Sequence, residues 1–387
     1  MQLFSRSMTA SQTGKDKLGA TPVDVRGRRS WRIAMLYNRL AGLPLAIQSY
    51  GLQPLKRTTP AGWPRHTTVV RLQGDGEEGG GEDINYNAGE QAAFQAAGVH
   101  LALTGTFTLE SFSAHLDQLN LFPSPPGSPA NRLFRRWAFE SAALDLALRQ
   151  AGLSLPAALS REPRPTRFVV SLGLGEPPEV EPLTDILALN PTARFKVDLS
   201  RDWTAATVAA LADLDVVDTV DLKGLYRGDF QGPPANADQY RQVAEGLPQV
   251  WIEDPDLNEQ TSPVLQPHAD RITWDANIHS LADILQLPFP PRCINIKPSR
   301  FGLLSELLRV YEYCEARGIA MYGGGQFELG LGRQQIQLLA AIFHPDTAND
   351  VAPVVYNRAV LPDSLPASPL QPPANMPGFA RSTTDEF

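Results

Sequence analysis

Five short apolar runs, each ending in charged residues, decide the fold of this chain: Arg194-Phe-Lys-Val-Asp198, Thr219-Val-Asp-Leu-Lys-Gly224, Val250-Trp-Ile-Glu-Asp-Pro255, Ile272-Thr-Trp-Asp-Ala-Asn277 and Ile294-Asn-Ile-Lys-Pro-Ser-Arg300. A brief, continuous apolar run is typical of a parallel strand that is buried on both faces. The residues that directly follow such strands lie where a β/α barrel holds its chemistry. We therefore look for the functional residues at the ends of these runs.

The spacing of the runs is that of alternating strands and helices. The charged residues Lys196, Asp221, Glu253, Asp275 and Lys297 follow one another at intervals of 22 to 32 residues, which leaves room for a strand, a helix and two loops. The first apolar run is at 168–175 and the last at 319–323, with amphipathic segments at 205–212, 237–245, 280–286 and 303–317 between them. About seven strands in this order favour a closed barrel over an open sheet. No dinucleotide-binding glycine motif follows the first run.

The residues before the barrel predict a different architecture. Apolar and β-branched residues at 47–55 and 67–72 predict antiparallel strands, and helical patterns follow at 88–99, 108–119 and 130–151. Strands followed by helices indicate an α+β domain. The glycine-rich and acidic stretch Gly74–Asp83 is interpreted as a hairpin turn, because it has no Gly-Lys-Ser/Thr motif and its acidic residues would repel a phosphate.

Composition narrows the range of partners and locations. The chain of 387 residues has 34 basic and 42 acidic residues, a net charge of −8, which argues against binding to nucleic acid or to an anionic membrane. Two cysteines cannot build a disulfide framework and fit a reducing cytoplasm. The pair Arg28-Arg29 before an apolar segment is similar to a twin-arginine export signal, but Arg39 interrupts that segment. We therefore expect a cytoplasmic protein without a membrane segment.

Three carboxylates at successive strand ends predict a metal site. Asp221, Glu253 and Asp275 offer only oxygen ligands, which favours Mg²⁺ over Zn²⁺. The alternative is that each carboxylate caps the helix that follows its strand. Because the three come from consecutive strands and have lysines on both sides, we favour the metal.

The two lysines predict proton transfer. Lys196 and Lys297 come from strands on either side of the carboxylates, so they could face each other across a bound substrate. A lysine near a cation and a second lysine can have its pKa lowered toward neutrality, which makes it a usable base. Mg²⁺ would stabilise the enolate that forms when a proton leaves the carbon next to a carboxylate. The alternative for each lysine is a solvated side chain or a salt bridge.

Together these motifs resemble the mandelate racemase/muconate lactonizing branch of the enolase superfamily, and most closely o-succinylbenzoate synthase. The resemblance implies a modified (β/α)7β barrel under an N-terminal α+β capping domain. It implies that Lys196 and Lys297 are the catalytic acid/base pair, that Asp221, Glu253 and Asp275 hold Mg²⁺, and that the substrate is a small carboxylate. It also makes six residues candidates for contact with the substrate: Arg194, Lys223, Arg300, Gly324, Gln326 and Glu328.

The resemblance and the composition set expected domain boundaries. We expect an N-terminal extension at 1–44, the capping domain at 45–152, the barrel at 165–345 and a C-terminal segment at 346–387 that packs back on the cap. In this family the capping-domain loops, here near 56–66 and 77–90, set specificity. The sequence leaves open the identity of the substrate and whether the chain forms a homo-oligomer.

Departures from the family pattern open alternatives. Arg194 stands where the family has the first lysine of Lys-x-Lys, and Lys223 stands where it has the asparagine of Asp-x-Asn. Lys223 is two residues beyond Asp221 and points to the same face, where its ammonium would compete with Mg²⁺. The chain could therefore be a metal-independent relative, including a non-catalytic binding protein. Elimination and racemisation both stay open, as does a less favoured Schiff-base mechanism. In the loop that follows, which includes Asp229 and Phe230, Tyr226 or Arg227 either reaches into the site or is exposed.

Overall fold

The computed structural model describes residues 35–59, 62–227, 231–358, 360–372 and 376–379, all of which belong to one compact unit. Arg28-Arg29, Asp229 and Phe230 lie outside the described residues, so the interpretations placed on them stay predictions. Among the described helices, none is long and apolar enough to cross a membrane.

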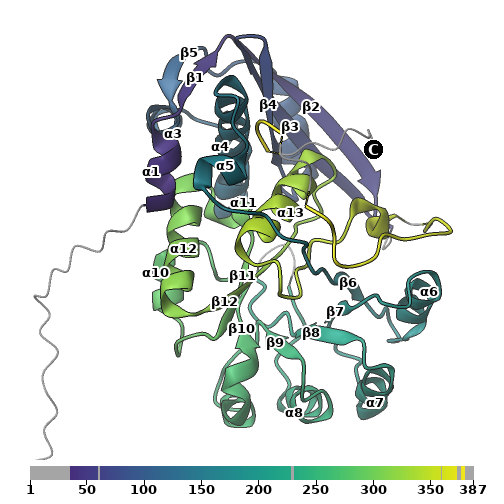
Figure 1. Cartoon of the computed structure of the whole chain (residues 1–387). Coiled ribbons are helices and arrows are strands. Elements are labelled where there is room, and N and C mark those ends of the chain that lie inside the picture. The colour runs from purple at the N-terminus through teal and green to yellow at the C-terminus, as the bar shows by residue number, and fades with distance from the viewer. Residues whose placement is uncertain (1–34, 60–61, 228–230, 359, 373–375, 380–387) are drawn as a thin grey trace, which may run out of the picture. The chain divides into compact units, whose positions relative to one another are not determined.

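The N-terminal half contains a three-stranded antiparallel sheet in the order β2-β3-β4, with bounds Ser49–Thr58, Pro64–Gly74 and Glu77–Asp83. Helix α4 (Pro129–Gln150) packs on this sheet (Figure 1). A Cβ at Gly81 would lie 2.0 Å from the carbonyl oxygen of Ala138 in that helix. The prediction of a turn over the whole stretch from Gly74 to Asp83 was therefore too broad: the turn lies at Asp75-Gly76, and the later glycines form a strand that lets α4 approach closely.

The remaining N-terminal elements surround this sheet and helix. Strand β1 (Pro44–Ile47) pairs antiparallel with β5 (Gly105–Thr108). The helices are α1 (Met35–Ala41), α2 (Ala88–Ala97), α3 (Leu109–Leu116) and α5 (Leu155–Leu159). Leu40 in α1 is fully buried, and the backbone N–H of Leu36 donates to Glu312 at 2.8 Å. Residues 35–44, which were expected to belong to an N-terminal extension, are thus part of the folded unit.

Parallel strands form the C-terminal half. Five strands lie in the order β10-β9-β8-β7-β6, and β11 pairs with β12. Their bounds are Val170–Gly173 (β6), Phe195–Asp198 (β7), Val217–Asp221 (β8), Trp251–Glu253 (β9), Ile272–Thr273 (β10), Cys293–Ile296 (β11) and Ala320–Gly323 (β12). The N–H of Asn295 in β11 donates to the carbonyl of Trp274 at 3.0 Å, which connects the two groups.

A short eighth segment closes the ring. Asp350 bridges in parallel to Gly324 just after β12, and Asn349 bridges in parallel to Phe168 just before β6. The barrel therefore closes through residues 349–350, beyond the boundary expected at 345. The sequence missed this segment because it is too short to show a strand pattern. The predicted (β/α)7β barrel with an N-terminal α+β domain is confirmed.

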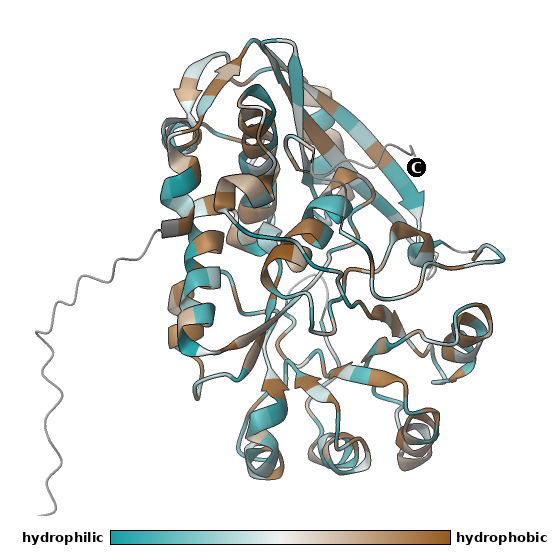
Figure 2. Ribbon diagram, viewed as in Figure 1, coloured by the Kyte–Doolittle hydropathy of each residue, from teal (hydrophilic) through white to brown (hydrophobic). Residues whose placement is uncertain are grey.

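Helices follow the strands along the chain. They are α6 (Glu181–Leu189), α7 (Ala205–Leu214), α8 (Ala237–Gly246), α9 (Ser262–Leu265), α10 (Leu281–Leu285), α11 (Pro298–Phe301), α12 (Leu304–Arg317) and α13 (Leu331–Phe343), with 3-10 turns at Gln266–Arg271 and Val354–Asn357. Val197, Val220 and Ile252 are fully buried, as expected for strands covered on both faces. In Figure 2 the barrel strands are mostly apolar in colour, whereas β2 carries polar segments.

Two sets of contacts connect the halves. Glu82 at the end of β4 accepts hydrogen bonds from the backbone N–H groups of Leu329, Gly330 and Gly332 at 2.7, 3.0 and 3.0 Å. It thereby places a carboxylate at the N-terminus of α13, where negative charge is stabilising. The C-terminal segment contacts both halves: Leu370 bonds to Thr166 before the barrel, and the N–H of Phe379 donates to Asp145 of α4 at 2.9 Å.

Candidate functional site

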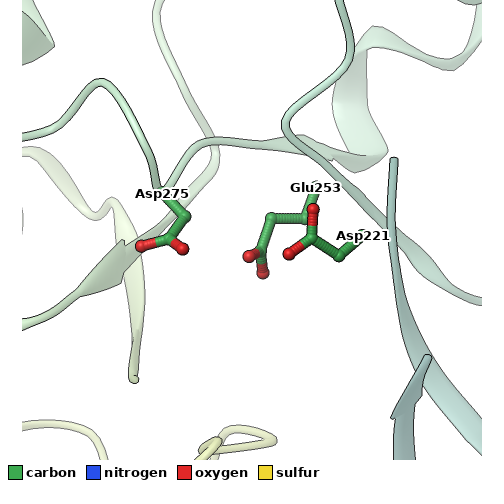
Figure 3. Close-up of side chains that lie close together, drawn as sticks. All are labelled: Asp221, Glu253 and Asp275. Carbon is green, nitrogen blue, oxygen red and sulfur yellow. The ribbon is translucent and has the colours of Figure 1, made fainter. Parts of the chain in front are cut away.

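The carboxylates predicted to bind metal lie together at the C-terminal ends of the barrel strands. Asp221 is in register with Glu253 on the neighbouring strand, and Glu253 is in register with Thr273, two residues before Asp275. All three carboxylates are buried, and one oxygen of each lies within 4.8 Å of the others (Figure 3). Since the strands are parallel, equivalent ends meet at one mouth, and the sequence prediction rested on this property.

Lys196 lies one register layer deeper than these carboxylates. It pairs with Thr219, two residues before Asp221, and only 1% of it is exposed. Its Nζ reaches toward the mouth, donates to Glu253 Oε1 and lies 3.3 Å from Asp221 Oδ2. Burial alone would lower the pKa of Lys196, but Glu253 and Asp221 raise it well above its usual value. Lys196 is therefore an ammonium ion held under the carboxylates.

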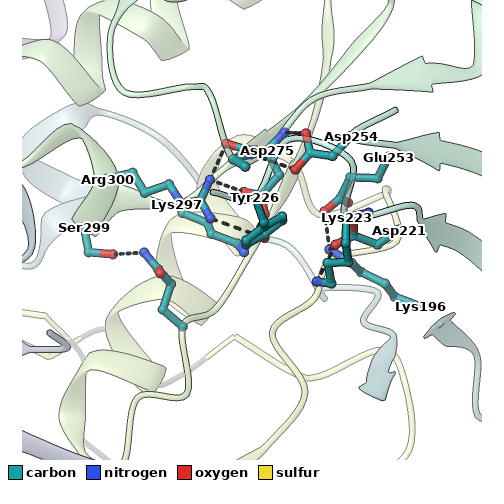
Figure 4. Close-up of polar contacts among 12 residues, drawn as sticks. Lys196, Asp221, Lys223, Tyr226, Glu253, Asp254, Asp275, Lys297, Ser299 and Arg300 are labelled. Carbon is teal, nitrogen blue, oxygen red and sulfur yellow. Dashed lines mark hydrogen bonds and ion pairs between the residues drawn. The ribbon is translucent and has the colours of Figure 1, made fainter. Parts of the chain in front are cut away.

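Lys297 and Arg300 approach Asp275 from the other side. Lys297 Nζ donates to Asp275 Oδ2 at 2.7 Å, and Arg300 Nη1 lies 3.2 Å from Asp275 Oδ1. Burial would raise the pKa of Asp275, but Arg300 and Lys297 hold it well below its usual value. Figure 4 shows Lys297 and Arg300 on one side of the carboxylates and Lys196 on the other. The two lysines predicted as a pair therefore flank the cluster.

Lys223 lies among the carboxylates, as its position two residues beyond Asp221 suggested. Its Nζ is 2.6 Å from Asp221 Oδ2 and 3.1 Å from Asp198 Oδ1. Burial would lower the pKa of Lys223, but Asp198 and Asp221 raise it well above its usual value. Its backbone has a φ of +54°, in the left-handed region. Such a conformation costs a non-glycine residue about 1 kcal/mol or more, so the surrounding contacts hold this side chain in place.

Asp198 is a site residue that sequence reasoning missed. It is in register with Asp221, so it lies in the same layer as the carboxylates. The available signal was strand parity: residues 194, 196 and 198 share one face of β7, and the last of them is nearest the mouth. The charged group at the mouth end of β7 is therefore a carboxylate, and its ammonium partner comes from the neighbouring strand.

Arg194 lies outside the site. It directly precedes β7, and its guanidinium bonds to Asp218 at 2.5 and 2.9 Å and to the carbonyl of Asp215 at 2.6 Å. These partners are at the start of β8, the end opposite the carboxylates. The expectation that Arg194 contacts substrate was wrong. Arg194 precedes the first residue of β7, whereas the last residue, Asp198, is level with the carboxylates at the barrel mouth.

Two tyrosines complete the cluster. Tyr226 from the loop after β8 donates its hydroxyl to Asp275 Oδ2 at 2.9 Å, with Lys223 Nζ 4.8 Å from its ring centre. Tyr322 in β12 donates to Glu253 Oε2. Of the two loop residues weighed from sequence, Tyr226 reaches the site, whereas Arg227 is exposed and bonds to Gly224 and Asp256. Tyr322 could have been suspected only from its place near the end of the last apolar run.

The glycine-rich loop after β12 lies beside Lys297. A Cβ at Gly324 would come within 2.5 Å of Lys297 Cε, so glycine leaves room for that lysine. Gln326 donates its side-chain amide to Ser299 Oγ at 3.0 Å. Glu328 accepts from the N–H of Gln326 at 2.8 Å and lies 3.0 Å from Arg333. Glu328 therefore holds the loop in shape, which makes direct contact between its carboxylate and a substrate less favourable.

The carboxylate cluster fits a hard cation by donor type and spacing. Both oxygens of Asp221 and of Glu253, and Oδ2 of Asp275, nevertheless already accept hydrogen bonds within the described structure, whereas Asp275 Oδ1 is buried without a hydrogen-bond donor. Lys223 occupies both oxygens of Asp221 through its backbone N–H and its Nζ. Glu253 has Lys196 and Tyr322, and Asp275 has Lys297, Tyr226 and Arg300. Asp275 Oδ1 is thus open to a metal ion, whereas Asp221 and Glu253 could hold one only by sharing oxygens with the groups that already donate to them.

Comparison with protein families matches residues 38–158 and 162–358 to the N-terminal and C-terminal domains of a family described as "Domain of unknown function (DUF8230)". The chain belongs to the DUF8230 family. This DUF8230 chain is 29% identical over 210 residues to o-succinylbenzoate synthase of Geobacillus stearothermophilus, covering 51% of the chain and 52% of the relative. It is 29% identical over 221 residues to N-succinylamino acid racemase of Amycolatopsis sp, covering 53% and 56%. The chain thus spans about half the length of these curated relatives.

The fold of the DUF8230 chain is similar to that of muconate lactonizing enzyme from Pseudomonas putida. The TM-score is 0.61 at 18% identity, covering 86% of this chain and 96% of that enzyme. At this identity the likeness shows the fold alone. With the two sequence relatives, it confirms the resemblance to the mandelate racemase/muconate lactonizing branch of the enolase superfamily.

Proposed function

We propose that this chain is an enzyme that abstracts the proton α to the carboxylate of a small molecule and so generates an enolate. The observation that carries the proposal is the placement of Lys196 and Lys297 on two sides of one buried carboxylate cluster (Figure 4). The relatives support this reaction class, because a synthase that eliminates water and a racemase both begin with loss of an α-proton.

The position of each residue in the site determines the role that we propose for it. Lys297 and Lys196 serve as the acid/base pair, one taking the α-proton and the other stabilising negative charge or returning a proton. Elimination needs one base, whereas racemisation needs one on each face of the α-carbon. Arg300 and Tyr226 hold Asp275, so the carboxylate beside Lys297 keeps its orientation when the proton moves. Burial of the cluster strengthens each of these electrostatic interactions.

In this proposal Asp221, Glu253 and Asp275 would hold Mg²⁺, and the bound ion would supply positive charge that stabilises an enolate. A second candidate is a metal-independent relative, either an enzyme with altered chemistry or a binding protein without catalysis. The 2.6 Å contact between Lys223 Nζ and Asp221 favours it, because an ammonium ion then already occupies part of the cation position.

Calorimetric titration separates the two candidates. Metal-stripped wild type, Lys223→Asn and Lys223→Arg are each titrated with MgCl₂, with Asp221→Asn as the variant that loses a ligand. Binding by the wild type at millimolar concentration or tighter supports the metal enzyme. Binding by Lys223→Asn alone, with none by the wild type or by the charge-retaining Lys223→Arg, selects the metal-independent candidate.

The reaction class has its own test. Exchange of the α-proton of N-succinylamino acids in D₂O is followed by NMR for the wild type, Lys297→Ala and the distant-site control Arg194→Met. Exchange by the wild type and the control, with a loss of about 10² to 10⁴-fold in Lys297→Ala, supports proton abstraction by Lys297. Exchange that survives in Lys297→Ala contradicts its role, and absence of exchange in the wild type across these compounds favours the binding protein.

A further inference from the structure

Three aromatic side chains from separate parts of the chain gather beside the site. Trp63 precedes β3, Tyr86 follows β4 and Phe327 lies in the loop after β12. The ring centres of Trp63 and Phe327 are 5.6 Å apart, and those of Trp63 and Tyr86 are 6.3 Å apart. Tyr86 is 46% exposed, and the other two are half-buried. We call these three residues the aromatic wall.

The backbone of the wall is held under strain. Phe327 has a φ of +52°, a conformation that costs a phenylalanine about 1 kcal/mol or more and persists only where its surroundings enforce it. Arg65 enforces it by donating to the carbonyls of Phe327 and Gln326 at 3.3 and 3.1 Å. The ring of Phe327 is therefore fixed against Trp63 although a glycine would suit this backbone better.

Arg65 is not available to bind an anion at the wall. An arginine has five N–H donors, and those of Arg65 also reach the backbone carbonyls of His66, Ile84 and Asn85. The guanidinium is fully buried and lies 4.1 Å from the ring centre of Tyr86. With its donors used inside the protein, Arg65 supports the aromatic face from behind, and what the wall offers to a ligand is mainly ring surface.

The wall adjoins the charged cluster. Gln326, next to Phe327, bonds to Ser299, which is next to Arg300. Burial raises the pKa of the Tyr86 phenol, and the positive charges of Arg65, Arg300 and Lys223 lower it in part. A ligand whose carboxylate lies at the barrel mouth would therefore have a partly exposed aromatic surface at its other end. Aromatic surface left accessible beside a polar site is typical of recognition of apolar groups.

We infer that the substrate is a carboxylate with an aromatic group at its far end, and that this group packs on Trp63, Tyr86 and Phe327. The inference rests on the proposed function and adds the chemical class of the substrate. It accounts for the strained Phe327 and for the exposure of Tyr86, which the proton-transfer chemistry alone does not require.

The test compares N-succinyl-L-phenylalanine with N-succinyl-L-alanine, which share their polar groups and differ in the ring. Binding of both to Lys297→Ala is measured by calorimetry, and α-proton exchange by the wild type is measured by NMR. We expect the phenylalanine compound to bind about tenfold more tightly, the preference that a stacked aromatic group provides. Phe327→Gly, made in the Lys297→Ala background, should remove most of this preference by weakening binding of the phenylalanine compound more than binding of the alanine compound.

The choice of variants separates a loss of ligand preference from a loss of folding. Phe327→Gly relieves the positive φ, so a folding defect is not expected from the backbone. Tyr86→Phe keeps the ring and should keep the preference, whereas Tyr86→Ala should reduce it. Equal affinity for the two compounds, no binding of the phenylalanine compound, or a preference unchanged in both Phe327→Gly and Trp63→Ala overturns the inference. If both compounds exchange their α-proton without preference, the proposed function is supported and the inference about the aromatic wall is contradicted. If the phenylalanine compound binds preferentially but neither compound exchanges, the inference is supported and the proposed function is contradicted.

Discussion

The ammonium of Lys223 lies 3.1 Å from Asp198 Oδ1, a pair that joins the mouth ends of β7 and β8. The resemblance assigned the base of β7 to Lys196 and led us to expect an asparagine in place of Lys223. The structure places the Asp198 carboxylate at the last residue of β7 and the Lys223 ammonium just after β8. The site thus keeps a cation near the substrate position, but that cation also touches Asp221, where a metal ion would be held.

Replacing Lys223 should make stability depend on Mg²⁺. In Lys223→Asn the buried Asp221 keeps only Lys196 as a nearby ammonium, and loss of a buried charge partner costs about 3 to 5 kcal/mol. We expect a lower midpoint of thermal unfolding in chelator and recovery on addition of MgCl₂, with a smaller Mg²⁺ effect on the wild type. Lys223→Arg, which keeps the charge, is the control. An equal Mg²⁺ effect on all three proteins would contradict competition between the Lys223 ammonium and Mg²⁺ for Asp221.

The two lysines proposed as the acid/base pair should differ in their effect on stability. Lys196→Met leaves Glu253 with Tyr322 but no ammonium, so we expect a loss of about 3 kcal/mol or more in the free energy of unfolding. Lys297→Met should cost less, because Asp275 keeps Arg300 and Tyr226. Urea unfolding measures the difference, and α-proton exchange should be lost in both variants. If Lys297→Met lowers the free energy of unfolding more than Lys196→Met does, the ion pairs assigned to Glu253 and Asp275 are contradicted.

Glu82 should contribute strongly to stability although it is remote from the chemistry. Glu82→Ala leaves the N–H groups of Leu329, Gly330 and Gly332 without their acceptor, and each buried unpaired group costs about 1 to 3 kcal/mol. Glu82→Gln keeps one acceptor oxygen and should cost less. Thr67→Val removes only the 2.8 Å bond from Thr67 to Glu82 and is the matched control. The urea midpoint should be lowest for Glu82→Ala, higher for Glu82→Gln and highest for Thr67→Val.

His344 should make the protein less stable in mild acid. Burial lowers the pKa of His344 to about 4. Its Nδ1 bonds to Asn349 Oδ1 at 2.6 Å, and because the amide nitrogen of Asn349 donates to carbonyls, Nδ1 carries the proton of a neutral ring. The unfolded chain takes up a proton near pH 6.5 and the folded chain only near pH 4. The stability contributed by His344 is therefore complete above pH 6.5 and is lost as the pH falls toward 4.

The loss attributable to His344 should be about 3 kcal/mol at most. It is measured as the difference in urea unfolding between the wild type and His344→Gln from pH 7.5 to 4, since the glutamine does not titrate and other groups cancel in the difference. Parallel curves for the two proteins would show that His344 does not account for the acid sensitivity.

Sequence alone could predict the fold class and the position of the carboxylates, because each of Asp221, Glu253 and Asp275 follows a distinct apolar run. It could not show which residue of β7 lies level with the carboxylates. Residues 194, 196 and 198 all point to one face of the strand, and only the register with β8 shows that Asp198 is level with Asp221. The roles of Glu82 and Arg65 could not be predicted either, since they depend on partners far away in the chain. The closing segment at 349–350 was missed because two bridging residues are too few to show a strand pattern.

The pairing of Asn349 with Phe168 and of Asp350 with Gly324 also sets an order of events during synthesis. The edge of β6 has no partner on that side until residues 349–350 have left the ribosome, by which time the other barrel strands are already made. An unpaired parallel edge is prone to association with other chains. The nascent chain is therefore most exposed to aggregation just before its last strand emerges, when a chaperone that covers a sheet edge would help it most.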